Sequence, residues 1–274
     1  MTINCKGQLV DISQPKVMGV LNVTLDSFYD GGSYKDESDI LNQVATMLTE
    51  GATFIDVGGY SSRPGADFVS EEEELKRVVP VIELILKEFP KTYISIDTFR
   101  SKVAKQTIET GAALINDISA GKLDEKMIET IGKFGVPYIM MHMRGNPKNM
   151  QSQTDYKDLV KDIVSYFGER IAQAHKAKIN DIIIDPGFGF AKTLKQNFEL
   201  LNRMELLKIT DKPILSGISR KSMIYKTLNT SASEALNGTT ALNMMALENG
   251  ASILRVHDVK EAMECVTLFN QLKS

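Results

Sequence analysis

Short apolar runs alternate with longer amphipathic segments along the whole chain. Eight runs, rich in β-branched residues, have the length of about three to six residues that is typical of buried parallel strands. They lie at residues 17–21, 53–57, 93–96, 113–115, 136–141, 182–184, 213–215 and 253–256. This alternation predicts strand–helix units, in which each strand is followed by a helix that crosses back over the sheet.

Apolar residues in the intervening segments recur at helical spacing. Ile40, Val44 and Met47 share one face of a helix, and the last segment places Ala262 and Val266 on another. A similar face is predicted at Leu200, Leu201, Met204 and Leu207. Capping boxes predict helix starts at Ser70/Glu73, Thr193/Gln196 and Ser231/Glu234.

Eight strand–helix units of similar length predict an α/β fold, a single (β/α)8 TIM barrel. Parallel crossovers are right-handed, so the eighth strand can return to pair with the first. An open doubly wound sheet is the alternative, but no GxGxxG motif follows the first run. Residues 3–12, with a turn at Lys6-Gly7, predict a short N-terminal β-hairpin at the bottom of the barrel, where the strands begin. Because no linker divides the sequence, residues 1–274 are expected to form one domain.

Composition narrows the classes of partner. Hydrophobic residues make up 43% and charged residues 24% of the chain, as in ordinary soluble proteins, and the net charge is −3. We therefore expect neither nucleic acid nor a membrane surface as a partner. Cys5 and Cys265 lack the spacing of a disulfide framework or a zinc site. No signal-peptide pattern or membrane-spanning run occurs, so a cytoplasmic location is expected.

Polar residues follow nearly every apolar run. They are Asn22, Asp97, Asn116, His142, Asp185, Ser216 and Arg255, and Asp56 lies just inside the end of its run. Any one of them could cap the turn that follows it. The carboxyl ends of barrel strands converge on one mouth, however, where barrel enzymes hold their active sites. A ring of such residues therefore predicts a polar ligand site.

Three loops extend this mouth. Residues 22–32 and 56–65 are polar and rich in glycine, and as neighbours in the barrel they are expected to form a mobile lid. Residues 216–222 follow the seventh run and carry Arg220 and Lys221, which would lie close to Arg255 and His257. Since loops after strands seven and eight commonly bind phosphate in this architecture, these cations are expected to bind an anion.

Eight collinear segments make the chain similar to dihydropteroate synthases, from Met18 to about Glu261. They are residues 18–32, 56–66, 94–98, 115–118, 141–143, 185–189 (Asp-Pro-Gly-Phe-Gly), 219–222 (Ser-Arg-Lys-Ser) and 255–258 (Arg-Val-His-Asp). The resemblance implies a transferase of folate biosynthesis that is a target of sulfonamides. It would condense 6-hydroxymethyl-7,8-dihydropterin diphosphate with 4-aminobenzoate, with Mg²⁺, to give 7,8-dihydropteroate and diphosphate. It also implies a homodimer.

The resemblance assigns roles to individual residues. The pterin ring would contact Asp97, Asn116, Asp185 and Lys221. The diphosphate would contact Asn22, Arg63, Arg255 and His257, with Asn22 also a ligand of Mg²⁺. The aminobenzoate would contact Phe28, Ser62, Pro64 and Ser222.

The same resemblance, with the chemistry of the substrate, predicts a dissociative reaction. Diphosphate would leave first, and a pterin cation would be stabilised by Asp26 and also by Asp56 or Asp97. Arg63, Asp97 and Lys221 complete the expected catalytic set. Leu25 stands where the family usually has proline, so the first loop is expected to be more mobile. Ser62 replaces the usual threonine and keeps its hydroxyl.

Two other functions fit parts of this pattern. The pterin-binding domain of a corrinoid-linked methyltransferase has a similar barrel and similar acidic residues, but it needs no diphosphate site. A non-catalytic pterin-binding protein would need neither the lid nor the diphosphate-binding groups. Asp26, Arg63, Lys221, Arg255 and His257 favour the synthase.

Overall fold

Eight parallel strands form a closed barrel in the computed structural model, which describes residues 1–23, 34–60 and 68–273. Going round the barrel, the strands follow the order β10-β3-β4-β5-β6-β7-β8-β9, so β10 closes onto β3. Their bounds are β3 Lys16–Asn22, β4 Phe54–Gly58, β5 Tyr93–Asp97, β6 Leu114–Asp117, β7 Tyr138–Met141, β8 Ile182–Asp185, β9 Ile214–Ser216 and β10 Ala251–Val256. All eight predicted strands and the predicted closure are confirmed.

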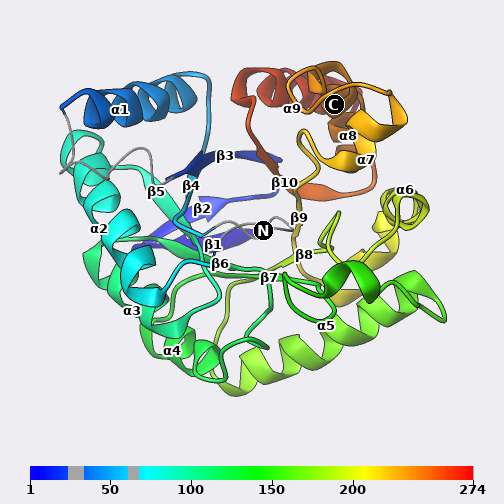
Figure 1. Cartoon of the computed structure of the whole chain (residues 1–274), viewed down its shortest axis with the longest axis horizontal. Coiled ribbons are helices and arrows are strands. Elements are labelled where there is room, and N and C mark those ends of the chain that lie inside the picture. The colour runs from blue at the N-terminus through cyan, green and yellow to red at the C-terminus, as the bar shows by residue number, and fades with distance from the viewer. Residues whose placement is uncertain (24–33, 61–67, 274) are drawn as a thin grey trace.

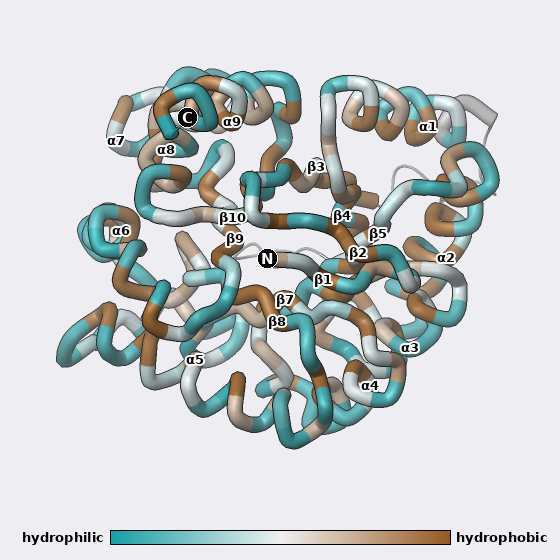
Figure 2. The backbone as a smooth tube through the Cα atoms, turned by 180° about the vertical axis from the view of Figure 1, so that it is seen from behind, coloured by the Kyte–Doolittle hydropathy of each residue, from teal (hydrophilic) through white to brown (hydrophobic). Residues whose placement is uncertain are grey.

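Helices surround the barrel, and each strand is followed by at least one of them (Figure 1). They are α1 Tyr34–Thr49, α2 Glu71–Glu88, α3 Ser101–Thr110, α4 Met127–Phe134, α5 Leu159–Lys176, α6 Leu194–Asn202, α7 Ser222–Thr227, α8 Leu236–Glu248 and α9 Val259–Lys273. Apolar residues lie along the strands, whereas the outer turns are hydrophilic (Figure 2). None of the helices in the described part of the chain has the length and apolar character needed to cross a membrane.

Helix starts agree with two of the three capping boxes. Ser70 accepts a hydrogen bond from Glu73 N at 3.1 Å where α2 begins, and Thr193 and Gln196 form a reciprocal box at the start of α6. The third helix start is wrong: Glu234 N donates to Ser231 Oγ at 3.4 Å, but a turn follows and α8 begins only at Leu236. The predicted face through Leu207 is also divided: α6 ends at Asn202, and the 3-10 helix η3 Met204–Thr210 follows.

The N-terminal hairpin closes the bottom of the barrel, as predicted. Its strands, β1 Thr2–Cys5 and β2 Gln8–Asp11, are antiparallel and share a buried apolar cluster with residues near the start of the barrel strands. The cluster contains Ile3, Cys5, Val10 and Ile12 from the hairpin and its exit, with Met18, Phe54, Ile139 and Ile183 among the barrel residues. Cys5 and Cys265 are buried free thiols.

We expect Ile12→Ala to lower the free energy of unfolding by about 2–4 kcal/mol, because it removes a buried side chain from this cluster. Leu9→Ala is the matched control on the same hairpin: Leu9 is 74% exposed, so its loss should cost less than about 0.5 kcal/mol. Urea unfolding measures both values. Equal losses in the two variants would contradict the packing of the hairpin against the barrel.

Candidate active site

The carboxyl ends of β3 to β6 place polar side chains in one row across the sheet. The strand register pairs Asn22 with Gly58, Gly58 with Asp97, and Asp97 with Asn116. Gly58 leaves room between its neighbours, since a Cβ built there would lie 3.5 Å from Asp97 Cβ and 4.0 Å from Asn22 Oδ1. Four residues that are scattered in the sequence thus share one level at the mouth of the barrel.

Arg255, on β10, joins two carboxylates across this mouth. Its Nε donates to Asp56 Oδ2 at 2.6 Å, and its Nη2 donates to Asp97 Oδ2 at 2.9 Å. Asn116 Nδ2 donates to the same Asp56 oxygen at 3.2 Å. A guanidinium has five N–H donors, so these two ion pairs leave donors for another anion. The four residues form a hydrogen-bonded cluster, which we call the Arg255 cluster.

Burial sets the charge balance of this cluster. Asp56 is fully buried, whereas the side chain of Asp97 is 20% exposed. Burial raises the pKa of Asp97 to about 7, and Arg255 opposes the rise. Asp56 Oδ1 has no hydrogen-bond partner among the described residues. A buried polar atom of this kind is expected where a polar ligand or water binds.

Asp185 and Lys221 lie next to the Arg255 cluster: a Cβ built at Gly217 would lie 3.9 Å from Asp185 Oδ2 and 4.0 Å from Arg255 Cβ. Asp185 ends β8 and accepts a hydrogen bond from Gly187 N at 2.7 Å. Lys221 precedes α7; its Nζ donates to the Phe188 carbonyl oxygen and lies 4.9 Å from the centroid of the Phe190 ring. Burial raises the pKa of Asp185 and lowers that of Lys221 to about 8, while each residue's charge favours the ionised form of the other.

His142 and Lys192 form a buried pair beside Asp185. Lys192 Nζ lies 3.0 Å from His142 Nδ1, and both side chains are at most 5% exposed. The sequence placed His142 in the ring but gave no reason to single out Lys192. Lys192 lies just before the Thr193 cap, a position where a lysine side chain is usually solvated. Only its closeness in sequence to the Asp-Pro-Gly segment could have indicated that it is buried.

The two cations of the seventh loop have different surroundings. Lys221 faces Asp185, but Arg220 binds Asp258 with two hydrogen bonds of 2.8 Å. Arg220 is therefore a structural residue that holds the loop to the start of α9, and the prediction that it belongs to the anion site is wrong. His257 Nδ1 lies 3.0 Å from Ser219 Oγ, and Ser222 begins α7.

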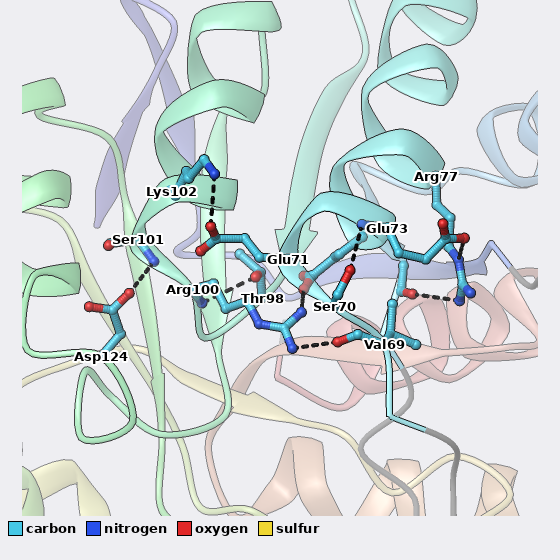
Figure 3. A network of polar contacts seen from close by, with 12 residues as sticks. Val69, Ser70, Glu71, Glu73, Arg77, Thr98, Arg100, Ser101, Lys102 and Asp124 are labelled. Atoms are coloured by element: carbon cyan, nitrogen blue, oxygen red, sulfur yellow. Dashed lines mark hydrogen bonds and ion pairs between the residues drawn. The ribbon is translucent and has the colours of Figure 1, made fainter.

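Two arginines hold the chain on either side of residues 61–67. Arg77 donates to the Gly59 carbonyl oxygen at 3.2 Å, and Arg100 donates to that of Val69 at 2.6 Å (Figure 3). Arg100 also pairs with the buried carboxylate of Glu74. The predicted site residues Asp26, Phe28, Ser62, Arg63 and Pro64 lie outside the described residues, as does Leu25.

A cavity of about 640 Å³ lies beside the ring, between the loop after β7 and α5. It is lined by Lys122, His142, Arg144, Asp162 and Tyr166, among others. Of the ring of strand-end residues its lining contains only His142. We therefore locate the ligand site at the Arg255 cluster, Asp185 and Lys221, where opposed charges converge. Within the described ranges, no group of three His, Cys, Asp or Glu is arranged to hold a metal ion.

The fold and this ring of polar groups define a barrel with charged side chains at the mouth where barrel enzymes hold their active sites. Comparison with known proteins agrees. Residues 18–257 match the model of the family described as pterin binding enzyme. The dihydropteroate synthase of Escherichia coli K12 is 45% identical over 97% of this chain and 94% of its own length.

Two solved structures show the same fold. A Yersinia pestis dihydropteroate synthase in a sulfonamide drug complex superimposes with a TM-score of 0.92 at 42% identity, over 100% of this chain and 99% of that one. The Xanthomonas albilineans enzyme with 4-aminobenzoic acid gives 0.91 at 34%, over 100% and 98%. The chain belongs to the pterin-binding enzyme family, and within it to the dihydropteroate synthases, which are transferases.

Proposed function

We propose that this enzyme condenses 6-hydroxymethyl-7,8-dihydropterin diphosphate with 4-aminobenzoate, in folate biosynthesis, and that sulfonamides inhibit it. The observation that carries the proposal is that Asp185 and Lys221, whose charges favour each other's ionised form, lie next to the Arg255 cluster. It offers a carboxylate for a planar heterocycle and a cation for a diphosphate within one mouth. The bound sulfonamide and 4-aminobenzoic acid of the two related structures support the choice of second substrate.

Asp185, Asp97, Asn116 and Lys221 would bind the pterin. Its amino-pyrimidinone edge carries adjacent N–H donors, and a carboxylate such as Asp185 can accept two of them at once. Lys221 supplies a donor for the ring heteroatoms and balances the charge of Asp185. Asp97 and Asn116, in neighbouring positions of the strand register, would contact the deeper part of the ring.

Arg255, His257, Arg63 and Asn22 would hold the diphosphate. Arg255 supplies the charge and has donors beyond those given to Asp56 and Asp97. Asn22 is exposed at the end of β3 and offers one neutral oxygen. A single such donor fits Mg²⁺, a strongly hydrated ion that takes its other ligands from phosphate and water. Bound there, the ion would neutralise charge on the leaving diphosphate.

Ser222, with Phe28, Ser62 and Pro64, would bind the aminobenzoate. Ser222 directly follows Lys221 and is the first residue of α7. A carboxylate of the second substrate at Ser222 would leave its amino group free to approach the pterin methylene carbon. This arrangement brings the two reacting atoms together without a dedicated base.

The proposed reaction is dissociative, with the leaving diphosphate and the pterin cation stabilised by charged residues of the site. The bond between the pterin methylene carbon and the diphosphate oxygen breaks, and the electron pair leaves with diphosphate. The resulting pterin cation would be stabilised by Asp26 and by the nearby Asp97 or Asp56 carboxylate. The amine nitrogen then donates its lone pair to that carbon, and the proton it loses passes to diphosphate or water.

We expect kcat/KM for the pterin diphosphate to fall as pH rises through about 8. Burial lowers the pKa of Lys221 to about 8, so its ammonium is present below that pH and is lost above it. Steady-state rates between pH 6 and 10 measure the profile. Lys221→Arg, whose charge does not titrate in this range, should lose the alkaline limb. A native profile that stays flat to pH 10 would contradict this role.

Release of diphosphate on mixing both substrates with Mg²⁺ tests the proposed function. We expect stoichiometric release together with dihydropteroate over many turnovers, and no turnover beyond the first bond cleavage on the enzyme when 4-aminobenzoate is omitted. A methyltransferase domain or a non-catalytic binding protein would bind a pterin but release no diphosphate. Absence of release from folded protein would overturn the proposal.

Three expectations from the sequence remain predictions. The homodimer is compatible with exposed apolar side chains on α8 and α9, namely Met245, Leu268 and Leu272. The assignment of residues 1–274 to one domain and the cytoplasmic location rest on sequence pattern alone.

A further inference from the structure

Lys192 is a buried lysine to which the proposed reaction assigns no role. It is 5% exposed, and its Nζ lies 3.0 Å from His142 Nδ1, 2.9 Å from the Gly187 carbonyl oxygen and 3.0 Å from that of Phe190. Burial lowers the pKa of Lys192 to about 7. Its ammonium form has three N–H donors, and these three acceptors use all of them. A buried ammonium is costly without partners, so these bonds fix Lys192 against the two carbonyl groups and His142.

His142 is suited to be the third acceptor. Burial and the charge of Lys192 hold the pKa of His142 well below its usual value, so the ring is neutral. A neutral imidazole with its hydrogen on Nε2 accepts at Nδ1. Lys192 therefore links the end of β7, through His142, to the loop that follows β8.

The loop at residues 186–191 is fastened to its surroundings. A Cβ added at Gly187 would lie 2.1 Å from the His142 carbonyl oxygen, so the loop backbone passes directly against the end of β7. Gly189 N donates to Asn197 Oδ1 at 2.6 Å, and Tyr156 Oη donates to the Ala191 carbonyl oxygen at 2.9 Å. Lys192 adds two bonds from one atom, to residues 187 and 190.

The other side of this loop faces the proposed pterin site. Gly187 N donates to Asp185 Oδ1 at 2.7 Å. Lys221 Nζ donates to the Phe188 carbonyl oxygen and lies over the Phe190 ring. The residues that Lys192 holds are thus the ones that orient Asp185 and Lys221, or lie next to them.

We propose that Lys192 is a positioning residue for pterin recognition. By holding the Gly187 and Phe190 carbonyl groups, it sets the loop so that Asp185 and Lys221 face the same ring. The inference rests on the proposed pterin site. It predicts that loss of the Lys192 bonds weakens pterin binding more than it affects the second substrate, whose Ser222 lies outside the loop.

Lys192→Met, compared with Lys195→Met, tests this. Methionine keeps the length of the side chain without its donors, and Lys195 is exposed three residues further on, in α6. We expect Lys192→Met to raise the KM for pterin diphosphate about 10- to 100-fold, as the loss of supporting contacts around a site commonly does. The KM for 4-aminobenzoate at saturating pterin should stay within about threefold, and Lys195→Met should match the native enzyme.

A pair of His142 variants covers the case in which Lys192→Met does not fold. Asparagine can place an oxygen near the position of Nδ1, whereas leucine cannot. His142→Leu should therefore raise the pterin KM more than His142→Asn. An unchanged pterin KM in folded Lys192→Met, or equal values in the two His142 variants, would overturn the inference. If the unmutated enzyme, correctly folded, showed no turnover, the proposed function would be overturned instead.

Discussion

Asp185→Asn is expected to reduce kcat/KM for the pterin diphosphate by about a thousandfold, the equivalent of two charge-assisted hydrogen bonds. Asp185 is 5% exposed and lies beside Lys221 and Arg255, so its charge is part of the balance of the site. Asparagine keeps the shape of the side chain and an oxygen for Gly187 N. It replaces the second acceptor by an N–H donor, however, which would face the donors of the pterin edge.

Steady-state kinetics and calorimetric titration with the pterin substrate measure this effect. Asp211→Asn is a matched control, because Asp211 is exposed in a left-handed turn with φ 52°, a conformation that asparagine adopts readily. The control should keep the native rate. If Asp185→Asn kept its rate within about fivefold of the native enzyme, Asp185 would not be the residue that recognises the pterin.

Arg255→Met is expected to abolish activity and to lower the free energy of unfolding by about 3 kcal/mol. The variant leaves Asp56, fully buried, and Asp97 without the cation that pairs with both. It also removes the charge proposed to bind diphosphate. Arg255 opposes the rise in the pKa of Asp97, so without it the carboxyl protonates at a higher pH. The loss of stability should thus be larger at pH 8, where Asp97 of the native protein is ionised, than at pH 5, where it is protonated.

Urea unfolding at the two pH values measures the effect of Arg255 on stability, and steady-state rates measure its effect on activity. Asp56→Asn added to Arg255→Met removes one unpaired charge, so the double variant should recover part of the stability but none of the activity. Arg203→Met is the control, since Arg203 forms ion pairs at the surface and should lose less than about 1 kcal/mol. A double variant no more stable than Arg255→Met would contradict the coupling between Arg255 and Asp56.

The barrel could be predicted from sequence because its strands are buried on both faces. Runs such as 17–21 and 182–184 are continuously apolar, whereas the helices between them have one apolar face with helical spacing. Strands and helices can therefore be told apart in the sequence. Local detail was harder to predict. Leu200 to Leu207 has a spacing that fits a continuous helix and also fits a helix followed by a 3-10 helix, and only packing selects the second.

The ring of strand-end residues was also predictable, because a parallel barrel brings the ends of all strands to one mouth. The partners within it were not. Arg220 binds Asp258, which is 38 residues away, and Lys192 contacts His142 across 50 residues. Local sequence signals do not encode such distant pairs. The sequence could suggest a role for Arg220 from its neighbour Lys221, but not that its charge was already paired.

A structure of the enzyme with the pterin diphosphate bound tests the central claim most directly. We predict that the Asp185 carboxylate accepts hydrogen bonds from the amino-pyrimidinone edge of a ring that Lys221 also contacts, with the diphosphate beside Arg255 and His257. A pterin bound elsewhere, for example in the neighbouring cavity lined by Lys122 and Arg144, would contradict it.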